Sequence, residues 1–209
     1  MRITKLGHAC VRLEQDGVAL VLDPGVFTDP GAVDGATGVL VTHQHPDHLD
    51  VANLRATDAP IWTIPAVAEQ LRADAPDVAE RVTVVGPGES FDAGLPVRAV
   101  GALHALIHPD LDRLTNCGYV VTGDLTVFHP GDALTRPGGD VDVLCVPSSA
   151  PWLCSADAID LARAVGAPRS LAIHDRVYSE AGHGFLAAQM EALLPEGQEY
   201  VRLVDGADL

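Results

Sequence analysis

The sequence feature that most constrains the fold is a cluster of histidines and carboxylates, THQHPDHLD, at residues 42–50. It holds three of the chain's nine histidines and begins where VLVT (39–42) ends. Such a continuously apolar run is typical of a strand that is covered on both faces. A loop at the end of a buried strand is where binding residues are usually mounted. The cluster therefore predicts a functional loop rather than a solvated, histidine-rich turn.

The spacing H-x-H-x-D-H predicts two neighbouring metal positions. In an extended segment, His43 and His45 project to the same side. Pro46 keeps His45 extended and begins a turn, so Asp47 and His48 can face a second position nearby. The donors are imidazole nitrogen and carboxylate oxygen without sulfur. This set favours zinc, manganese, iron or nickel in a hydrolytic site over a structural, cysteine-rich zinc.

Three further candidate donors lie at the ends of predicted strands. His104 ends one such strand, Asp132 lies just past another, and His174 ends a third. Gly131 lets the backbone approach closely beside Asp132. Each of the three alone has an ordinary alternative, a buried and satisfied histidine or an aspartate in a turn. Together they supply the donors that the histidine cluster lacks.

The rest of the chain reads as short strands in two blocks, each with helices on its outside. The dipeptide Asp16-Gly17 predicts a hairpin turn near the N-terminus, and Ser155 is the predicted N-cap of a helix that ends at Gly166. This pattern predicts two sheets packed face to face between helical layers, in a single domain over 1–209. The predicted strands include 18–22, 39–42, 82–85, 96–104, 118–122, 125–129, 141–146, 170–174 and 199–204, and the predicted helices are 64–73, 155–166 and 184–194.

The motifs THQHPDHLD, GALHA, HPGDA and AIHD, in this order and at these separations, resemble the metallo-β-lactamase superfamily. The resemblance covers nearly the whole chain. It implies an α/β fold, a four-layer αββα sandwich of two mixed sheets packed face to face with helices outside, and a dinuclear metal site at one edge. The segments GHACVRLEQDGVALVLDPG and IHPDLDRLTNCGYVV are most similar to small, single-domain metal-dependent hydrolases, a branch that includes ascorbate-6-phosphate lactonase.

The resemblance also implies a ligand for each coordination position. Three histidines would hold one metal ion, two histidines and an aspartate the other, and a second aspartate would bridge them. In that order the ligands are His43, His45 and His104; His48, His174 and Asp47; and Asp132. The implied cofactors are two divalent cations, with zinc first and manganese, iron or nickel as alternatives. The glutamate that replaces the second histidine in flavodiiron proteins is absent, which argues against oxygen reduction.

The implied activity is that of a metal-dependent hydrolase. Two ions about 3.5–4 Å apart lower the pKa of a shared water and hold hydroxide at neutral pH, with Asp47 as a catalytic residue that orients it. The expected substrate is a small ester, lactone or phosphodiester. The alternatives are a small nuclease or cyclic-nucleotide phosphodiesterase, and a metal-dependent binding or sensing protein without turnover.

Charge and targeting signals narrow the expected partners. The formal net charge of -16 repels phosphate backbones, so we expect no stable nucleic-acid binding. Two divalent cations would still make the centre locally positive, so a small anionic substrate can bind. No signal peptide and no run of about 18 apolar residues is present, which predicts a cytoplasmic protein without membrane association. Four cysteines without a C-x-x-C pair predict reduced thiols in or near the core. The sequence leaves the oligomeric state open.

His8, in the turn GHAC, is predicted to be a second catalytic residue, a proton donor or substrate contact at the edge of the site. A packed turn histidine is the alternative. The weaker candidates are His108, Asn116 and Trp152 for substrate contact, His129 for packing or support of a ligand, His183 for capping or surface exposure, and Asp175 for orienting a ligand.

Overall fold

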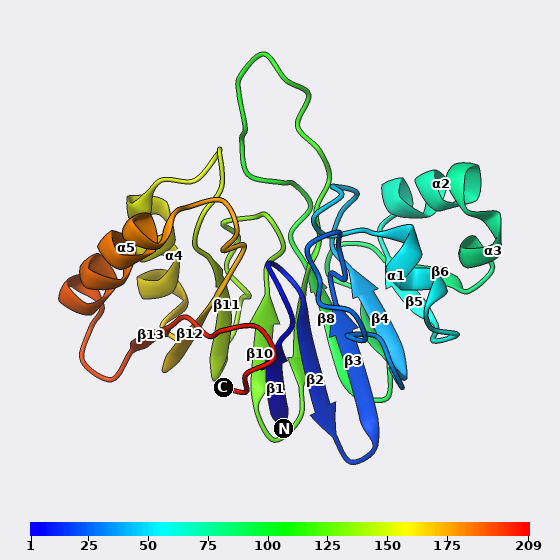
Figure 1. Ribbon diagram of the computed structural model, residues 1–209, viewed down its shortest axis with the longest axis horizontal. Coiled ribbons are helices and arrows are strands. Elements are labelled where there is room, and N and C mark those ends of the chain that lie inside the picture. Colours follow the sequence, from blue (N-terminus) through cyan, green and yellow to red (C-terminus); the bar gives the residue numbers. More distant parts are fainter.

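The computed structural model describes all 209 residues and shows two sheets packed face to face, with helices on both outer sides (Figure 1). This arrangement confirms the predicted αββα sandwich. No helix has both the length and the apolar content that crossing a membrane requires. One outer layer holds α1 (Val51–Arg55), α2 (Pro65–Asp74) and α3 (Pro76–Ala79), and the other holds α4 (Ser155–Val165) and α5 (Glu180–Leu193).

The first sheet contains six strands in sequence order. Its first three strands are antiparallel and the rest are parallel, which makes it a mixed sheet. Asp16 and Gly17, which join the second strand to the third, have φ angles of 51° and 83°, as a two-residue hairpin turn requires. The strands are β1 (Arg2–Lys5), β2 (Val11–Gln15), β3 (Val18–Leu22), β4 (Gly38–Val41), β5 (Ile61–Thr63) and β6 (Val82–Val84).

The second sheet contains seven strands in the order β13-β12-β11-β10-β9-β8-β7. The pairs from β13 to β10 are parallel and those from β10 to β7 are antiparallel, so this sheet is also mixed. The strands are β7 (Ser90–Asp92), β8 (Pro96–Val100), β9 (Gly118–Thr122), β10 (Thr126–His129), β11 (Val143–Pro147), β12 (Arg169–Ile173) and β13 (Glu199–Val201).

Two apolar cores hold the layers together. A cluster of 30 buried residues contains side chains from both sheets, such as Leu13, Leu40 and Val121. A second cluster of 15 residues joins the second sheet to α4 and α5. Burial of apolar surface contributes about 25 cal/mol per Å², so the strands with apolar residues on both faces are the ones fixed most firmly. These strands hold the ends of the loops that follow them in place.

Several element boundaries differ from the predictions. The strand predicted over 96–104 ends at Val100, because Gly101 has a φ of 80° and turns the chain away. His104 therefore lies in a loop rather than at a strand end. The N-cap of α4 is Cys154 rather than Ser155, with Asp157 closing a capping box. The last helix, α5, begins at Glu180 instead of residue 184, because the Ser179 hydroxyl accepts a hydrogen bond from the backbone N–H of Gly182 in its first turn.

The cysteine prediction is correct for three residues. Cys10, Cys117 and Cys145 are buried and free, and none of the four thiols is in a disulfide. Cys154 is exposed, because it caps α4 at the surface.

Candidate metal centre

The predicted donors come from loops at one end of the sandwich. The histidine cluster follows β4, Asp132 follows β10, His174 follows β12, and His8 lies in the turn between β1 and β2. A long segment between β8 and β9, residues 101–117, carries His104 and protrudes from the same end (Figure 1). Rigid strands thus fix donors that are far apart in the sequence.

The first group of donors consists of His43, His45, His104 and Asp132, whose donor atoms all lie within 4.8 Å of one another. His43 Nε2 lies 3.0 Å from His45 Nδ1, and His104 Nε2 lies 3.3 Å from an oxygen of Asp132. Two nitrogens on one tetrahedral zinc ion are about 3.3 Å apart, given Zn–N bonds of about 2.0–2.1 Å. The spacing of this group fits a single ion.

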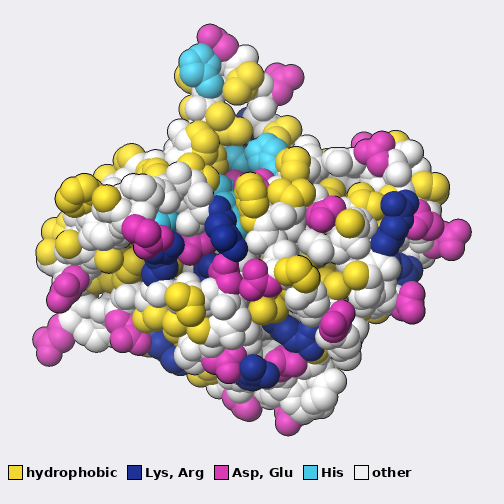
Figure 2. Space-filling model, viewed as in Figure 1, with side chains coloured by type: hydrophobic (Ala, Val, Ile, Leu, Met, Phe, Trp, Pro, Cys, Tyr) yellow, Lys and Arg dark blue, Asp and Glu magenta, His cyan; other side chains and the backbone are white.

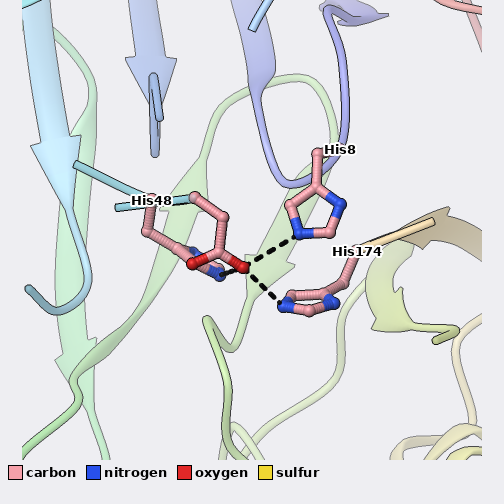
Figure 3. A group of neighbouring side chains, drawn as sticks. His8, His48 and His174 are labelled. Carbon is pink, nitrogen blue, oxygen red and sulfur yellow. Dashed lines mark hydrogen bonds and ion pairs between the residues drawn. The ribbon is translucent and has the colours of Figure 1, made fainter. Parts of the chain in front are cut away.

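The second group consists of His8, Asp47, His48 and His174, again with donor atoms within 4.8 Å of one another. Figure 3 shows the three imidazoles pointing towards one carboxylate. Asp47 Oδ2 lies 3.1 Å from the Nε2 atoms of both His8 and His174 and 4.0 Å from that of His48. The turn at Pro46 therefore directs Asp47 and His48 to a second position, as predicted.

Asp132 lies between the two groups. Its Oδ1 atom is 3.0 Å from His48 Nε2, and its Oδ2 atom is 3.3 Å from both His104 Nε2 and His174 Nε2. One carboxylate therefore faces histidines of both groups. The structure brings together all seven predicted ligands.

Hydrogen bonds fix how three of these histidines are oriented. A neutral imidazole carries one proton, and an Nδ1–H bonded to a protein oxygen leaves the lone pair on Nε2. Metal-binding histidines are typically held in this way. His48 Nδ1 donates to Asp23 Oδ2 at 2.7 Å, and His104 Nδ1 donates to the Ala105 carbonyl at 2.7 Å. His174 Nδ1 donates to the Ser149 carbonyl.

The Nε2 atoms of these three histidines, together with Asp132 Oδ1, are buried and have no hydrogen-bond partner. They approach one another closely, but their directions do not form hydrogen bonds. A buried polar atom left unpaired costs about 1–3 kcal/mol. Four such atoms, spread over the two donor groups, fit metal ligation, which would satisfy all of them.

Asp23 is a site residue that the sequence analysis missed. Its fully buried carboxylate accepts hydrogen bonds from the backbone N–H and the hydroxyl of Thr42, at 2.8 and 2.7 Å, and from His48. The Thr42 hydroxyl in turn accepts from His43 Nδ1 at 3.0 Å. One carboxylate thus orients a histidine in each donor group. Asp23 ends the apolar run of β3, and that position could have identified it, but Asp-Pro-Gly reads as a plain turn.

Left-handed backbone conformations mark the same region. His8, Asp23 and His174 have φ angles of 47°, 49° and 55°. Non-glycine residues adopt this conformation at a cost of about 1–3 kcal/mol, and such residues gather at functional sites. Two of these residues, His8 and His174, belong to the second donor group, and Asp23 supports it through His48.

His8 lies at the predicted place, the edge of the site. The backbone N–H of Arg176 donates to His8 Nδ1 at 3.2 Å, so the proton of a neutral ring is on Nε2, which points at Asp47. Burial lowers the pKa of His8 and keeps the ring neutral. The ring lies edge-on to Phe27, with centroids 5.3 Å apart. This geometry makes His8 a hydrogen-bond donor to Asp47.

The carboxylates change the pKa values of the second group. Burial lowers the pKa of His174, but Asp132 and Asp47 outweigh it and raise the pKa to about 9. Burial likewise opposes a charge on His48, yet Asp132 and Asp23 raise its pKa well above the usual value. Without a bound cation, the neighbouring carboxylates thus favour the protonated form of both rings. A bound cation would have to displace these protons.

Three weaker candidates support the turn that carries Asp132. The side-chain oxygen of Asn116 accepts from the backbone N–H of Asp132 at 3.0 Å. A Cβ atom on Gly131 would lie 2.4 Å from that oxygen, which confirms the predicted close approach. His129 is buried and donates to the Ala9 carbonyl at 2.8 Å. The Trp152 indole N–H donates to Asp132 Oδ2 at 3.2 Å, so this ring lies at the centre.

The predictions for His183 and Asp175 are wrong, and His108 lies away from the donor groups. His183 is buried rather than at the surface, because α5 starts one turn early and places it on the inner face, bonded to the Asp175 carbonyl. The Asp175 side chain orients no ligand ring but pairs with Lys5 at 3.0 Å. His108 is 60% exposed on the protruding segment and accepts a hydrogen bond from within its own loop.

Comparison with known proteins agrees with this geometry. The chain matches the Beta-lactamase superfamily domain over residues 2–174. Protein Rv0786c of Mycobacterium tuberculosis is 38% identical over 193 residues, which cover 88% of each chain. The UPF0173 metal-dependent hydrolase EAT1b_0495 of Exiguobacterium is 29% identical over 194 residues, 83% of this chain and 85% of that protein.

A solved structure supports the fold. The metallo-beta-lactamase fold protein YhfI from Bacillus subtilis superposes with a TM-score of 0.75, covering 100% of this chain and 98% of its own at 16% identity. This likeness concerns the fold alone. The relatives named as metal-dependent hydrolases confirm the predicted enzyme class. Over most of its length, the chain belongs to the β-lactamase superfamily, among its metal-dependent hydrolases.

Proposed function

We propose that this hydrolase has a dinuclear centre and acts on a small ester, lactone or phosphodiester. His43, His45 and His104 would hold one ion, and Asp47, His48 and His174 the other. The observation that carries this proposal is the position of Asp132, whose two oxygens face histidines of both groups at 3.0–3.3 Å. We expect zinc, since the donor set of imidazoles and carboxylates suits it.

Two divalent cations at these positions would activate water and stabilise negative charge on the substrate oxygen. The chain's own groups supply orientation and protons. Asp47 is 24% exposed, so it is a carboxylate that can face both the ligand groups and an incoming substrate. We propose that it orients the attacking water.

His8 is the proposed proton donor. Its neutral ring holds the proton on Nε2, beside Asp47, at the edge of the second donor group. To donate to a leaving oxygen, the His8 ring first takes up a second proton from solvent, and it returns to its neutral form when it gives one proton away. The Asp47 carboxylate beside the ring favours this uptake, so His8 and Asp47 form the proposed proton-donating pair at the exposed edge of the centre.

The test pairs metal content with turnover. Metal-loaded wild-type protein is assayed against lactones, thioesters, oxyesters and phosphodiesters, and each variant is analysed for bound metal. Asp132→Ala should lower the occupancy of both ions and abolish hydrolysis while the fold persists. Asp124→Ala, which removes a 73% exposed carboxylate, is the matched control and should change neither. Retention of activity within a few-fold in Asp132→Ala would refute the bridging role.

A further inference from the structure

Large apolar side chains that are exposed to solvent gather around the candidate metal centre. Four of the twelve such residues are scattered elsewhere: Val84, Phe185, Leu193 and Val204. The other eight belong to loops that carry or contact the ligands, and we call them the apolar rim. The apolar rim consists of Val26, Phe27, Leu103, Leu106, Ile107, Leu111, Leu134 and Val177, each 39–57% exposed.

Contacts tie the apolar rim to the centre. The Phe27 ring lies edge-on to His8, and the backbone N–H of Val26 donates to the carbonyl of Pro46, within the histidine cluster, at 2.8 Å. Leu134 follows Asp132 by two residues and Val177 follows His174 by three. The rim therefore shares its loops with the ligands.

The protruding segment supplies the other half of the rim. It begins and ends beside the ligands, since Ala105 N–H donates to the Asp132 carbonyl at 2.7 Å. Four of its leucine and isoleucine side chains face solvent. Figure 2 shows apolar side chains next to the histidines that reach the surface below this segment.

Two cationic side chains near the centre already have partners. Arg113 donates to the backbone carbonyl of His104 at 2.6 Å, and Arg176 pairs with Asp205. The tip of the segment carries Asp110 and Asp112, both exposed. Arg113 is the one cationic side chain of the protruding segment, so this segment offers little positive charge to a polyphosphate.

Exposed apolar patches on soluble proteins mark binding sites for ligands, partners or membranes. The position of the apolar rim around the centre favours a ligand over a partner protein. Asp47 and His45 are the partly exposed ligands, and a partner protein seated on the rim would cover both and close the centre to substrate. An apolar group of the substrate itself would cover the apolar rim and still leave the reactive group at the metal centre.

We infer that the substrate is amphiphilic, with a hydrolysable ester or lactone group at the metal centre and an apolar alkyl or acyl substituent against the apolar rim. This inference rests on the proposed function and narrows it. Water adds to the acyl carbon, the acyl C–O bond to the leaving oxygen breaks, and that oxygen takes a proton. The products are a carboxylate and an alcohol, which stay in one molecule when the substrate is a lactone. One proton passes to solvent, and no co-reactant other than water is needed.

Straight-chain carboxylates from acetate to decanoate are the probes, because they mimic the product of such a reaction and cannot be hydrolysed. Calorimetry on the zinc-loaded protein gives a Kd for each. Burial of a methylene group against apolar surface strengthens binding by about two- to fourfold. We expect Kd to fall by this factor with each added methylene until the chain extends past the rim, and kcat/KM for the matching esters to rise in parallel.

The rim variant carries Leu106→Ser, Ile107→Ser and Leu111→Ser on the protruding segment. It should bind acetate as the wild type does but lose most of the chain-length dependence. Phe185→Ser, on α5 and 73% exposed, is the control that removes an equally exposed apolar group far from the centre. It should behave as the wild type.

Three results would overturn the inference. The first is a wild-type Kd that does not change with chain length, or no carboxylate binding at all. The second is an unchanged slope in the rim variant. The third is evidence that a second copy of the chain or a lipid surface covers the rim. The observation would be a dimer in sedimentation, or binding to neutral phosphatidylcholine vesicles, which the rim variant abolishes. Failure of the proposed function looks different: the protein takes up no metal, or hydrolyses no member of the substrate panel.

Discussion

Replacement of Asp23 by asparagine tests how the two donor groups are held. The Asp23 carboxylate accepts three hydrogen bonds in a fully buried place, two from Thr42 and one from His48. Asparagine has nearly the same shape and tolerates a positive φ better than most residues, so residue 23 can keep its φ angle of 49°. Its amide keeps one acceptor oxygen but places an N–H₂ group where an acceptor is needed.

The loss can be estimated from the structure. At least one of the three donors loses its partner, and a hydrogen bond to a charged group contributes about 1.5–3 kcal/mol. The same change removes the anion that favours the Nδ1–H form of His48, so its Nε2 lone pair is no longer held towards the second donor group. Supporting groups of this kind typically alter metal affinity about 10–100-fold. We expect a weakening of this size for one ion, with a smaller effect on the other through Thr42.

The assay is a competition titration of metal-free protein against a chromophoric zinc chelator, with thermal unfolding measured in parallel. Asp34→Asn is the control, since its carboxylate lies on an exposed loop. Thr42→Val provides the complementary variant, because it removes the hydroxyl that links His43 to Asp23 and should weaken the first group instead. Unchanged zinc affinity in Asp23→Asn, in a folded protein, would refute the reasoning.

Three further predictions follow from single features of the site. His8→Ala should keep both metals yet slow turnover about 10–100-fold, measured as metal content and rate on one sample; loss of a metal would make His8 a ligand. Lys5→Met should lower the free energy of unfolding by about 1.5–3 kcal/mol, because it removes the buried ammonium that Asp175 and Asp205 share and leaves them only Arg202 and Arg176; urea denaturation measures this, and Lys5→Met with Asp175→Asn should recover part of the loss. The raised pKa of His174, about 9, predicts that apparent zinc affinity increases with pH and levels off above about pH 9. In metal-free protein the same residue stabilises the fold fully below about pH 6.5, the unfolded value, and this contribution is lost as pH rises through about 9; a flat pH profile of both quantities would contradict the prediction.

The sequence predicts which side chains meet at this edge of the sandwich, because local geometry and strand ends determine it. The alternation between His43 and His45 and the turn at Pro46 are properties of the chain itself, and they divide the cluster between two positions. Asp132 and His174 follow buried strands, and the ends of those strands meet at one edge of the sandwich. These features need no knowledge of side-chain packing.

Properties that depend on packing escaped the sequence. Asp23 supports the site through bonds to Thr42 and His48, residues 19 and 25 positions away, and nothing local distinguishes it from a turn aspartate. His183 becomes buried only because α5 starts early, and Asp175 turns to Lys5, which is 170 residues away in the chain. The apolar rim likewise becomes visible only when loops from distant strands are placed together.

The most direct test of the dinuclear centre is the number of zinc ions that metal-free protein binds. Calorimetric titration, checked by elemental analysis after dialysis, gives this number directly. Asp132 belongs to one donor group and also faces two histidines of the other, and this position predicts two ions per chain. Binding of a single ion, or of none, by folded protein would contradict the account.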